Sequence, residues 1–246
     1  MDPNPIVQEL INKTFREMNE PKNPLERSRI ATTTNGYIHL AAWSNAQLLR
    51  IFVRCFTSSL PKSEYRLKTQ LDDAARSTIA NIEEGFRRPT TMEYVTFLGY
   101  SQASLTEVKG DIQRSLQDGF LTSKPNFSLT SLNINLTDWH EKVKQSVISK
   151  PIDDKGFYRN LEESKGSKQI NNPPFQIPLK SFKFLYPPID NLTANQLTYE
   201  IFIELINKTD WHLRRLVVSL EDKLNRDQKF YQVEKARVRG NTKWRR

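Results

Sequence analysis

The sequence predicts an all-α protein, an antiparallel four-helix bundle with a long insertion before its fourth helix. Apolar residues recur at every third or fourth position in four long segments, which is the spacing of one helix face. Short links that contain proline separate the first three segments, and short links make neighbouring helices antiparallel. A stretch dominated by Asn, Ser, Lys and Pro precedes the fourth segment.

The chain of 246 residues divides by composition into three parts. Residues 1–36 are predicted to be an N-terminal arm, because prolines and a Thr-rich run interrupt a short amphipathic segment there. Residues 37–225 are predicted to form the bundle, with the insertion at residues 121–192. Residues 226–246 are predicted to be a basic C-terminal tail.

The first two predicted helices are separated by a proline. Residues 37–60 contain an apolar stripe over six turns, and Pro61 ends it because proline cannot continue a helix interior. Ser63 is then expected to cap the second helix, which closes near Gly85. Small residues such as Ala75 on this helix allow another helix to approach closely.

The third helix is predicted to start at Thr90 or Thr91, with Glu93 complementing the helix dipole in its first turn. It is expected to end near Gly119. The fourth helix is predicted over residues 194–225, with Trp211 on its buried side.

The insertion is interpreted as a segment that becomes ordered through contact with the bundle. A short helix is predicted from Asp138 to about Ile148. Apolar residues alternate loosely from Phe175 to Leu185, and this segment is expected to be extended and to pack on the bundle.

The net charge of +9, with a pI of about 9.6, is concentrated at one end of the chain. Residues 226–246 hold eight Lys or Arg residues and two acidic residues, and therefore six of the nine excess positive charges. Such an excess indicates an anionic partner, because cations neutralise phosphates and aromatic side chains stack on unpaired bases. The alternative is a tail that only aids solubility.

The predicted nucleic-acid-binding residues therefore lie mainly in the tail. A second candidate is the pair Arg87-Arg88 at a helix end, where interaction with terminal carbonyl groups is an equally good structural explanation. The complete set is Arg87, Arg88, Lys229, Lys235, Arg237, Arg239, Lys243, Trp244, Arg245 and Arg246.

The sequence indicates no catalytic residue, metal site or cofactor, and hence no enzyme. No glycine-rich phosphate loop of familiar spacing is present. His39, His140 and His212 are far apart in the sequence, and each is expected on a partly exposed helix face. The single cysteine, an N-terminus without a secretion signal and the absence of a long apolar run predict a cytoplasmic protein.

One segment has a distinctive pattern: Leu60-Pro61-Lys62-Ser63-Glu64-Tyr65-Arg66-Leu67, Gln70-Leu71, Ala74-Ala75-Arg76-Ser77, Asn81-Ile82 and Glu84-Gly85-Phe86. It closely resembles the four-helix bundle proteins encoded by intervening sequences in bacterial large-subunit ribosomal RNA genes. It is also similar to the accessory variability determinant proteins of diversity-generating retroelements. The resemblance covers about residues 37–120, and residues 195–239 resemble the suffix segment of a longer subfamily. Glu83 departs from the pattern, since family members usually carry a small residue there.

The resemblance implies a homopentameric barrel of bundles and no catalytic residue. The apolar runs Phe52-Val53 and Ile201-Phe202-Ile203 also offer more apolar surface than four helices need, which favours a homo-oligomer. The motif residues are interpreted as structural: Arg76 is expected to pair with Glu84 or Glu107, Asn81 to hydrogen-bond across helices, and Gly85 to belong to the same motif.

From these patterns we expect a non-enzymatic accessory or scaffold protein that binds nucleic acid, specifically structured RNA, and forms a ring-shaped homo-oligomer. The alternative is an interaction adaptor that binds a reverse transcriptase, as the retroelement branch of the resemblance implies.

Overall fold

The computed structural model describes residues 35–148 and 185–242. By its internal contacts the chain divides between Thr34 and Asn35, and all of the described residues belong to the second unit. Within these residues the protein is all-α, as predicted, with one isolated β-bridge between Thr122 and Thr198. The expected extended segment at residues 175–185 lies almost wholly outside the described residues.

Four long helices form the body of this unit, and short helical elements connect or cover them. The long helices are α3 (Ala41–Ser59), α4 (Tyr65–Arg87), α5 (Thr91–Gln117) and α10 (Tyr199–Thr242). The short elements are η1 (Gly36–His39), η2 (Lys62–Glu64), η3 (Leu129–Leu132), α6 (Leu136–Ile148), α9 (Pro187–Asp190) and η4 (Ala194–Gln196).

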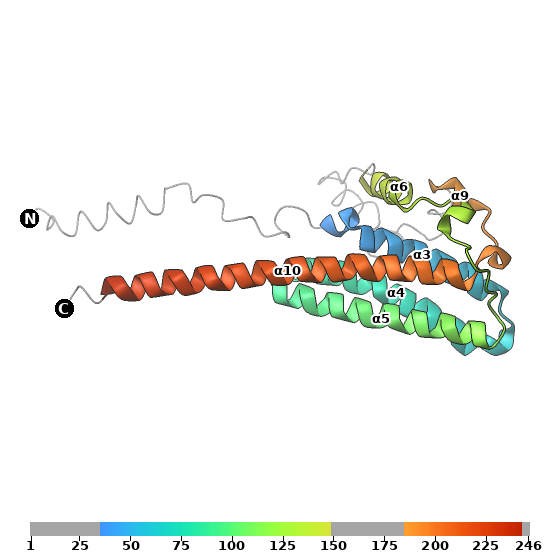
Figure 1. Ribbon diagram of the computed structural model, residues 1–246, viewed down its shortest axis with the longest axis horizontal. Coiled ribbons are helices and arrows are strands. Elements are labelled where there is room, and N and C mark those ends of the chain that lie inside the picture. Colours follow the sequence, from blue (N-terminus) through green and yellow to red (C-terminus); the bar gives the residue numbers. More distant parts are fainter. Residues whose placement is uncertain (1–34, 149–184, 243–246) are drawn as a thin grey trace, which may run out of the picture. The chain divides into compact units, whose positions relative to one another are not determined.

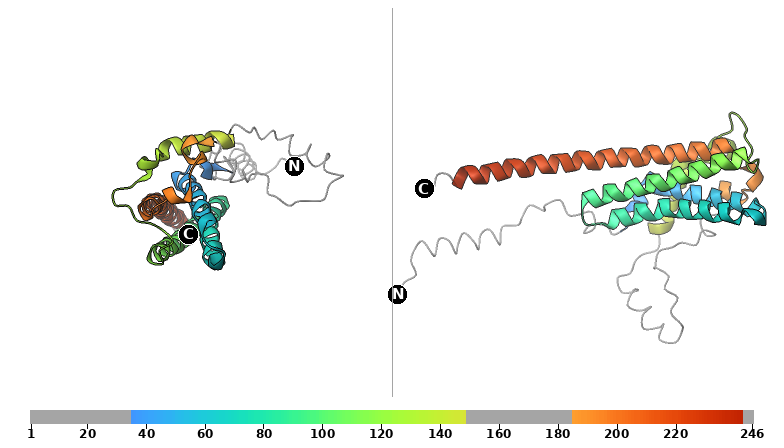
Figure 2. Two further views of the ribbon diagram at one scale, coloured as in Figure 1. Left: turned by 90° about the vertical axis from the view of Figure 1, so that its right-hand side faces the viewer. Right: turned by 90° about the horizontal axis from the view of Figure 1, so that it is seen from below.

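The four long helices lie side by side, and each packs against two others (Figures 1 and 2). Helix α4 packs on α3 and α5, and α10 packs on α5 and α3. Asp72 near the start of α4 pairs with Arg50 and Arg54 of α3, at 3.4 and 3.1 Å. The Gln102 amide of α5 donates a hydrogen bond of 3.2 Å to Asp210 of α10.

Helix α3 is the most deeply buried of the four. Most of its residues are inaccessible to solvent, including the polar residues Ser44, Asn45 and Gln47. Phe202 of α10 contacts α3, with its ring centre 6.2 Å from that of Phe52.

The predicted surplus of apolar helix surface is therefore absent at two of its main positions. Phe52 and Phe202 are both fully buried within a single chain. The reason is that the two rings pack against each other between α3 and α10, so these side chains need no second copy.

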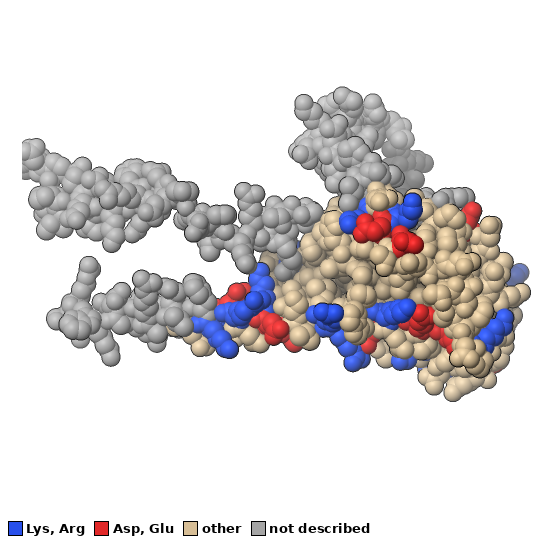
Figure 3. Space-filling view, turned by 45° about the horizontal axis from the view of Figure 1, so that its top comes forward, with Lys and Arg blue, Asp and Glu red and all other residues tan. Residues whose placement is uncertain are grey.

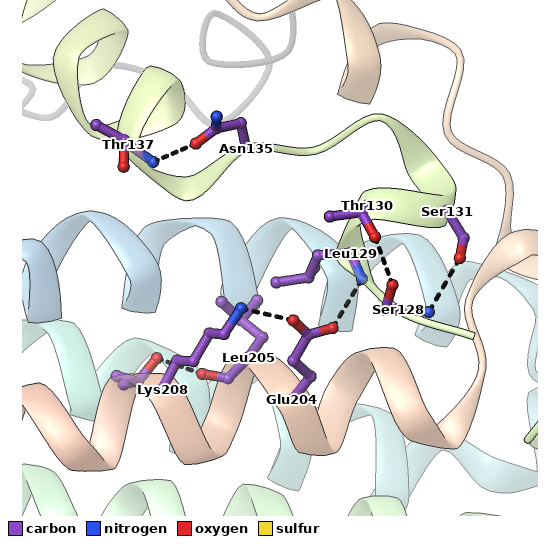
Figure 4. A network of polar contacts seen from close by, with 10 residues as sticks. Ser128, Leu129, Thr130, Ser131, Asn135, Thr137, Glu204, Leu205 and Lys208 are labelled. Carbon is purple, nitrogen blue, oxygen red and sulfur yellow. Dashed lines mark hydrogen bonds and ion pairs between the residues drawn. The ribbon is translucent and has the colours of Figure 1, made fainter. Parts of the chain in front are cut away.

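The described parts of the insertion pack on the bundle, as expected. Helix α6 begins two residues earlier than predicted and lies over α3 and η1 (Figure 2). Trp139 of α6 is fully buried, and so is Ile189 of α9. The carboxylate of Glu204 on α10 accepts a hydrogen bond of 2.8 Å from the backbone N–H of Leu129, which holds η3 on α10 (Figure 4).

The start of two helices differs from prediction, and the start of another agrees with it. Ser63 does not cap α4; its hydroxyl donates instead to the carboxylate of Glu64, and η2 precedes the helix. Thr90 caps α5 in a capping box with Glu93, so that both side chains satisfy backbone donors. Helix α10 begins at Tyr199, later than predicted, because η4 is a separate turn.

Helix α10 continues beyond the end predicted at residue 225 and reaches Thr242. With 44 residues it is about 66 Å long, whereas the 27 residues of α5 span about 40 Å, so α10 extends past the other helices (Figure 1). No proline or glycine interrupts the chain between residues 226 and 239, and many residues there are good helix formers.

Candidate nucleic-acid interface

A basic surface lies on α10 beside a hollow of about 850 Å³. We call the residues that line this hollow the α10 surface; they are Trp211, Arg214, Arg215, Val218, Ser219, Asp222, Asn225, Arg226 and Lys229. Their spacing of three and four residues places them on one side of the helix. Figure 3 shows Lys and Arg side chains in a row along this helix, with acidic side chains between them.

Trp211 is exposed on this surface, so the prediction that it faces the core is wrong. The residue is 52% exposed, whereas Leu213 is fully buried. Residues two apart on a helix point about 200° away from each other, and the core side of α10 is occupied by Leu213. The guanidinium of Arg215 lies 4.7 Å from the centre of the Trp211 ring.

Cations outnumber carboxylates on the α10 surface, which has four cationic side chains and one acidic residue, Asp222. Arg214 forms an ion pair of 2.7 Å with Asp210 on the preceding turn. Within the described residues, no ion pair engages Arg215, Arg226 or Lys229. Cations without an internal partner attract phosphate groups, so this side of α10 suits a nucleic-acid backbone.

The predicted tail residues relate to this surface in different ways. Lys229 belongs to it, and positions 235, 237 and 239 lie further along the same continuous helix. Arg215, Arg226 and position 237 are spaced by 11 residues, or about three turns, and therefore share one side of α10. The last four predicted residues, Lys243, Trp244, Arg245 and Arg246, lie outside the described residues.

Arg87 and Arg88, at the end of α4, are engaged within the chain. Arg87 donates a hydrogen bond of 3.3 Å to the Tyr37 hydroxyl, and its guanidinium lies 5.4 Å from the centre of that ring. Arg88 pairs with Glu84 and lies 4.5 Å from the centre of the Phe97 ring. These contacts favour the structural explanation for both arginines, and their nucleic-acid role stays a prediction.

Two of the motif residues do not make the contacts predicted for them. Arg76 pairs with Asp73 at 3.6 Å on its own helix, and not with Glu84 or Glu107, because both members of the pair face solvent one turn apart. Asn81 is half-buried, and it forms no hydrogen bond across helices with any residue that the structure describes.

Gly85 marks a very close approach between α4 and α5. A Cβ atom at this position would lie 2.6 Å from the Cβ of Phe97 and 2.9 Å from the Cδ2 of Tyr94. A side chain there would force the helices to shift, so this contact supports the structural role predicted for Gly85.

Glu83, the departure from the family pattern, is tied to the start of α3. Its carboxylate accepts a hydrogen bond of 2.8 Å from the Nε1 of Trp43. Burial raises the pKa of this carboxyl above its ordinary value, while the Trp43 hydrogen bond and the Arg87 charge oppose the rise. Burial likewise raises the pKa of the nearby Tyr37 hydroxyl, and the charge of Glu83 adds to this effect.

Two neighbouring residues of α6 anchor it to Ser44 of α3. The Nε1 of Trp139 donates a hydrogen bond of 2.6 Å to the Ser44 carbonyl. The Nδ1 of His140 lies 2.9 Å from the Ser44 hydroxyl. That hydroxyl donates to the carbonyl of Ala41 at 3.0 Å, so it accepts from the His140 Nδ1–H.

The fold brings His140 within electrostatic range of His39 and of His212, which the sequence did not reveal. Burial lowers the pKa of His140, Lys144 and His39 lower it further, and Glu141 opposes them. Burial also lowers the pKa of His212, and Arg215 and His140 add to the effect. No group of three or more His, Cys, Asp or Glu residues in the described part of the chain could hold a metal ion.

The fold and the surface define an all-α protein with a long helix that is basic and partly aromatic. Residues 39–138 match the family model described as 23S rRNA-intervening sequence protein. The family resemblance predicted from the sequence is thereby confirmed over these residues, which include α3, α4 and α5. The α10 surface lies outside the match.

Comparison with curated proteins and with solved structures gave no match. None of the described helices combines the length and the apolar character needed to cross a lipid bilayer.

Proposed function

We propose that this protein is a non-enzymatic accessory or scaffold protein that binds RNA through α10. The observation that carries the proposal is the α10 surface, where an exposed tryptophan lies among four cations, three of which have no ion-pair partner in the described residues. Cations neutralise phosphates and an aromatic ring stacks on bases, so the combination suits a nucleic-acid strand. The name of the matched family refers to ribosomal RNA and supports RNA as the ligand.

In the same proposal, α3, α4, α5 and α10 form the antiparallel four-helix bundle that the resemblance implies. The pairing of Asp72 with Arg50 and Arg54 supports this arrangement, because the start of α4 meets the second half of α3. The bundle is then a rigid base from which α10 extends towards its ligand.

We further propose that copies of the chain assemble into a ring, with the pentamer as the expected state. The outer face of α5 supports an interface, because no charged residue occurs between Glu93 and Glu107. Met92 and Tyr100 on this face are 57% and 54% exposed, and Gly99 between them has open space beside it. A mass of 28.7 kDa by light scattering at micromolar concentration would show a monomer and overturn this part of the proposal.

The RNA proposal is tested by titrating labelled structured RNA at several salt concentrations. The double variant Arg226→Gln/Lys229→Gln should bind more weakly and show a smaller salt dependence. Each lost phosphate contact lowers the slope of log K against log salt by about 0.7–0.9, so the pair should lower it by roughly 1.4–1.8.

A matched control removes two exposed cations elsewhere. Lys62→Gln/Arg66→Gln changes the net charge equally, at the start of α4, and should leave the slope unchanged. Absence of RNA binding by the wild-type protein would overturn the proposal. Nuclease-resistant binding of a purified reverse transcriptase in its place would support the adaptor alternative.

A further inference from the structure

Trp211 differs from the two other tryptophans that the structure describes. Trp43 and Trp139 are 4% and 0% exposed, and the Nε1 of each donates to an acceptor in the fold. Trp211 is half exposed, and its Nε1 donates to no residue in the described ranges. Packing and hydrogen bonding therefore explain the first two residues and leave the position of Trp211 unexplained.

The neighbours of Trp211 make a platform that is apolar and cationic. The guanidinium of Arg215 lies against the indole ring, and its centre is 4.7 Å from that of the ring. Val218, two turns further along α10, is 55% exposed. The ion pair between Arg214 and Asp210 holds a second cation beside the platform.

We propose that Trp211 and Arg215 form a stacking site for one unpaired base, so that the α10 surface selects single-stranded or looped RNA over a continuous duplex. This inference rests on the proposed function. An unpaired base offers its faces to an aromatic ring, whereas a base inside a duplex is already covered by its neighbours. Arg215 adds a planar cation that stacks and donates hydrogen bonds to base edges or phosphates.

The remaining cations extend the same site along the helix. Arg226 lies 15 residues after Trp211, which is about 22 Å along the axis. Phosphates of one strand of a B-form duplex advance by about 3.4 Å along its axis, and those of an extended single strand advance further. A strand that stacks on Trp211 can therefore place later phosphates at Arg226 and Lys229. The site thus has one end that stacks on a base and another end that binds only the phosphate backbone of the RNA.

The Trp211–Arg215 contact could otherwise serve only to stabilise the helix, since the two residues are four apart. That role predicts a lower thermal stability for variants at Trp211, with no change in the preference between unpaired and duplex RNA. The ratio of the two affinities therefore separates the stacking role from the structural one.

The experiment uses the full chain and three fluorescent RNA probes: a 12-nucleotide single strand, its perfect duplex, and that duplex with a single-nucleotide bulge. Trp211→Leu should weaken binding of the single strand and of the bulged duplex by about 5- to 150-fold, the range for one base–aromatic stack. Binding of the perfect duplex should not change. Trp211→Phe keeps a smaller ring and should lose less, and Tyr65→Leu, at another exposed aromatic residue, should lose nothing.

The outcomes separate this inference from the proposed function. Equal affinities of the wild type and Trp211→Leu for the single strand would overturn the stacking site, and so would an equal loss for all three probes. The proposed function would still stand if Arg226→Gln/Lys229→Gln weakened binding of every probe. Failure of the wild-type protein to bind any probe would overturn both.

Discussion

The Nε1 of Trp43 donates a hydrogen bond of 2.8 Å to the carboxylate of Glu83, and so joins the first turn of α3 to the last turn of α4. Both groups are largely withdrawn from water, and each therefore depends on the other. A half-buried carboxylate in place of the small residue usual in the family changes how this end of the protein responds to pH.

The first prediction concerns Glu83. Because burial raises its pKa, the native protein holds this proton more tightly than the unfolded chain does. The carboxyl's contribution to stability is full when the pH is below 4.5, which is the ordinary pKa of this group. The contribution is lost as the pH rises through the native pKa. Glu83→Gln keeps an acceptor for Trp43 and does not titrate, so its advantage over the wild type in free energy of unfolding should grow from pH 4 to pH 7.

Urea unfolding of both proteins across this range measures that advantage. Glu83→Ala is the control, since it leaves the buried Nε1 of Trp43 without a partner and should cost about 1–3 kcal/mol. An advantage of Glu83→Gln that shrinks as the pH rises would contradict the prediction.

The second prediction concerns the contact between α4 and α5. Gly85→Ala should destabilise the protein by about 1–3 kcal/mol, because the added methyl group would meet Phe97 and Tyr94 at less than 3 Å. Gly110→Ala is the matched control on α5, where a Cβ would meet only the flexible end of Arg114, at 3.4 Å. Alanine should be neutral there or stabilise the helix by up to about 1 kcal/mol. Thermal unfolding that ranks the two variants in the opposite order would show that the helices are further apart.

The third prediction concerns the anchoring of α6. The fold lowers the pKa of His140 and that of His212. The contribution of these two residues to stability is therefore full when the pH is above 6.5, the ordinary pKa of histidine. It is lost as the pH falls from 6.5 towards the native pKa, because protonation places positive charge beside Lys144, His39 and Arg215. The protection factors of amide protons in α6, which correct for the slower intrinsic exchange at lower pH, should therefore fall between pH 7 and pH 5.

His140→Asn tests the source of this effect. Its amide can still donate to the Ser44 hydroxyl, but it does not titrate, so the protection factors in α6 should depend less on pH than in the wild type. Equal pH dependence in the two proteins would assign the effect to other groups.

The fourth prediction concerns the basic end of the chain. Deletion after Asn225 removes eight cationic side chains and truncates α10. If four to six of these side chains contact phosphates, the slope of log K against log salt should flatten by roughly 3–5. Lower solubility with unchanged RNA binding would indicate instead a tail that only keeps the protein in solution.

The first three helices could be predicted because their signals are local. Pro61 and the Thr90–Glu93 capping box set helix ends through backbone chemistry, and apolar residues repeat at helical spacing between them. The all-α class and the family resemblance over residues 39–138 follow from that pattern.

The wrong predictions of buried faces concern what each helix packs against, which depends on distant parts of the chain. Trp211 and Leu213 are both apolar, and only the position of α3 and α5 decides that Leu213 faces inward. In the same way, the sequence does not reveal that Trp139 and Ile189 of the insertion join the core around Phe52 and Phe202. The contact between Arg215 and Trp211 was not predicted for the same reason, because it forms on the side of α10 that faces away from the core.

Burial of most residues of α3 has a consequence for the order of local unfolding. Amide protons in the middle of α3 exchange only when α4, α10 and the insertion have all separated from it, so their opening free energy approaches that of the whole domain. Helix α10 beyond its last fully buried residue, Leu213, has no comparable restraint among the described residues. The RNA-binding proposal therefore places ligand contact on a part of α10 that opens more readily than α3, so that α3 stays closed when the ligand binds.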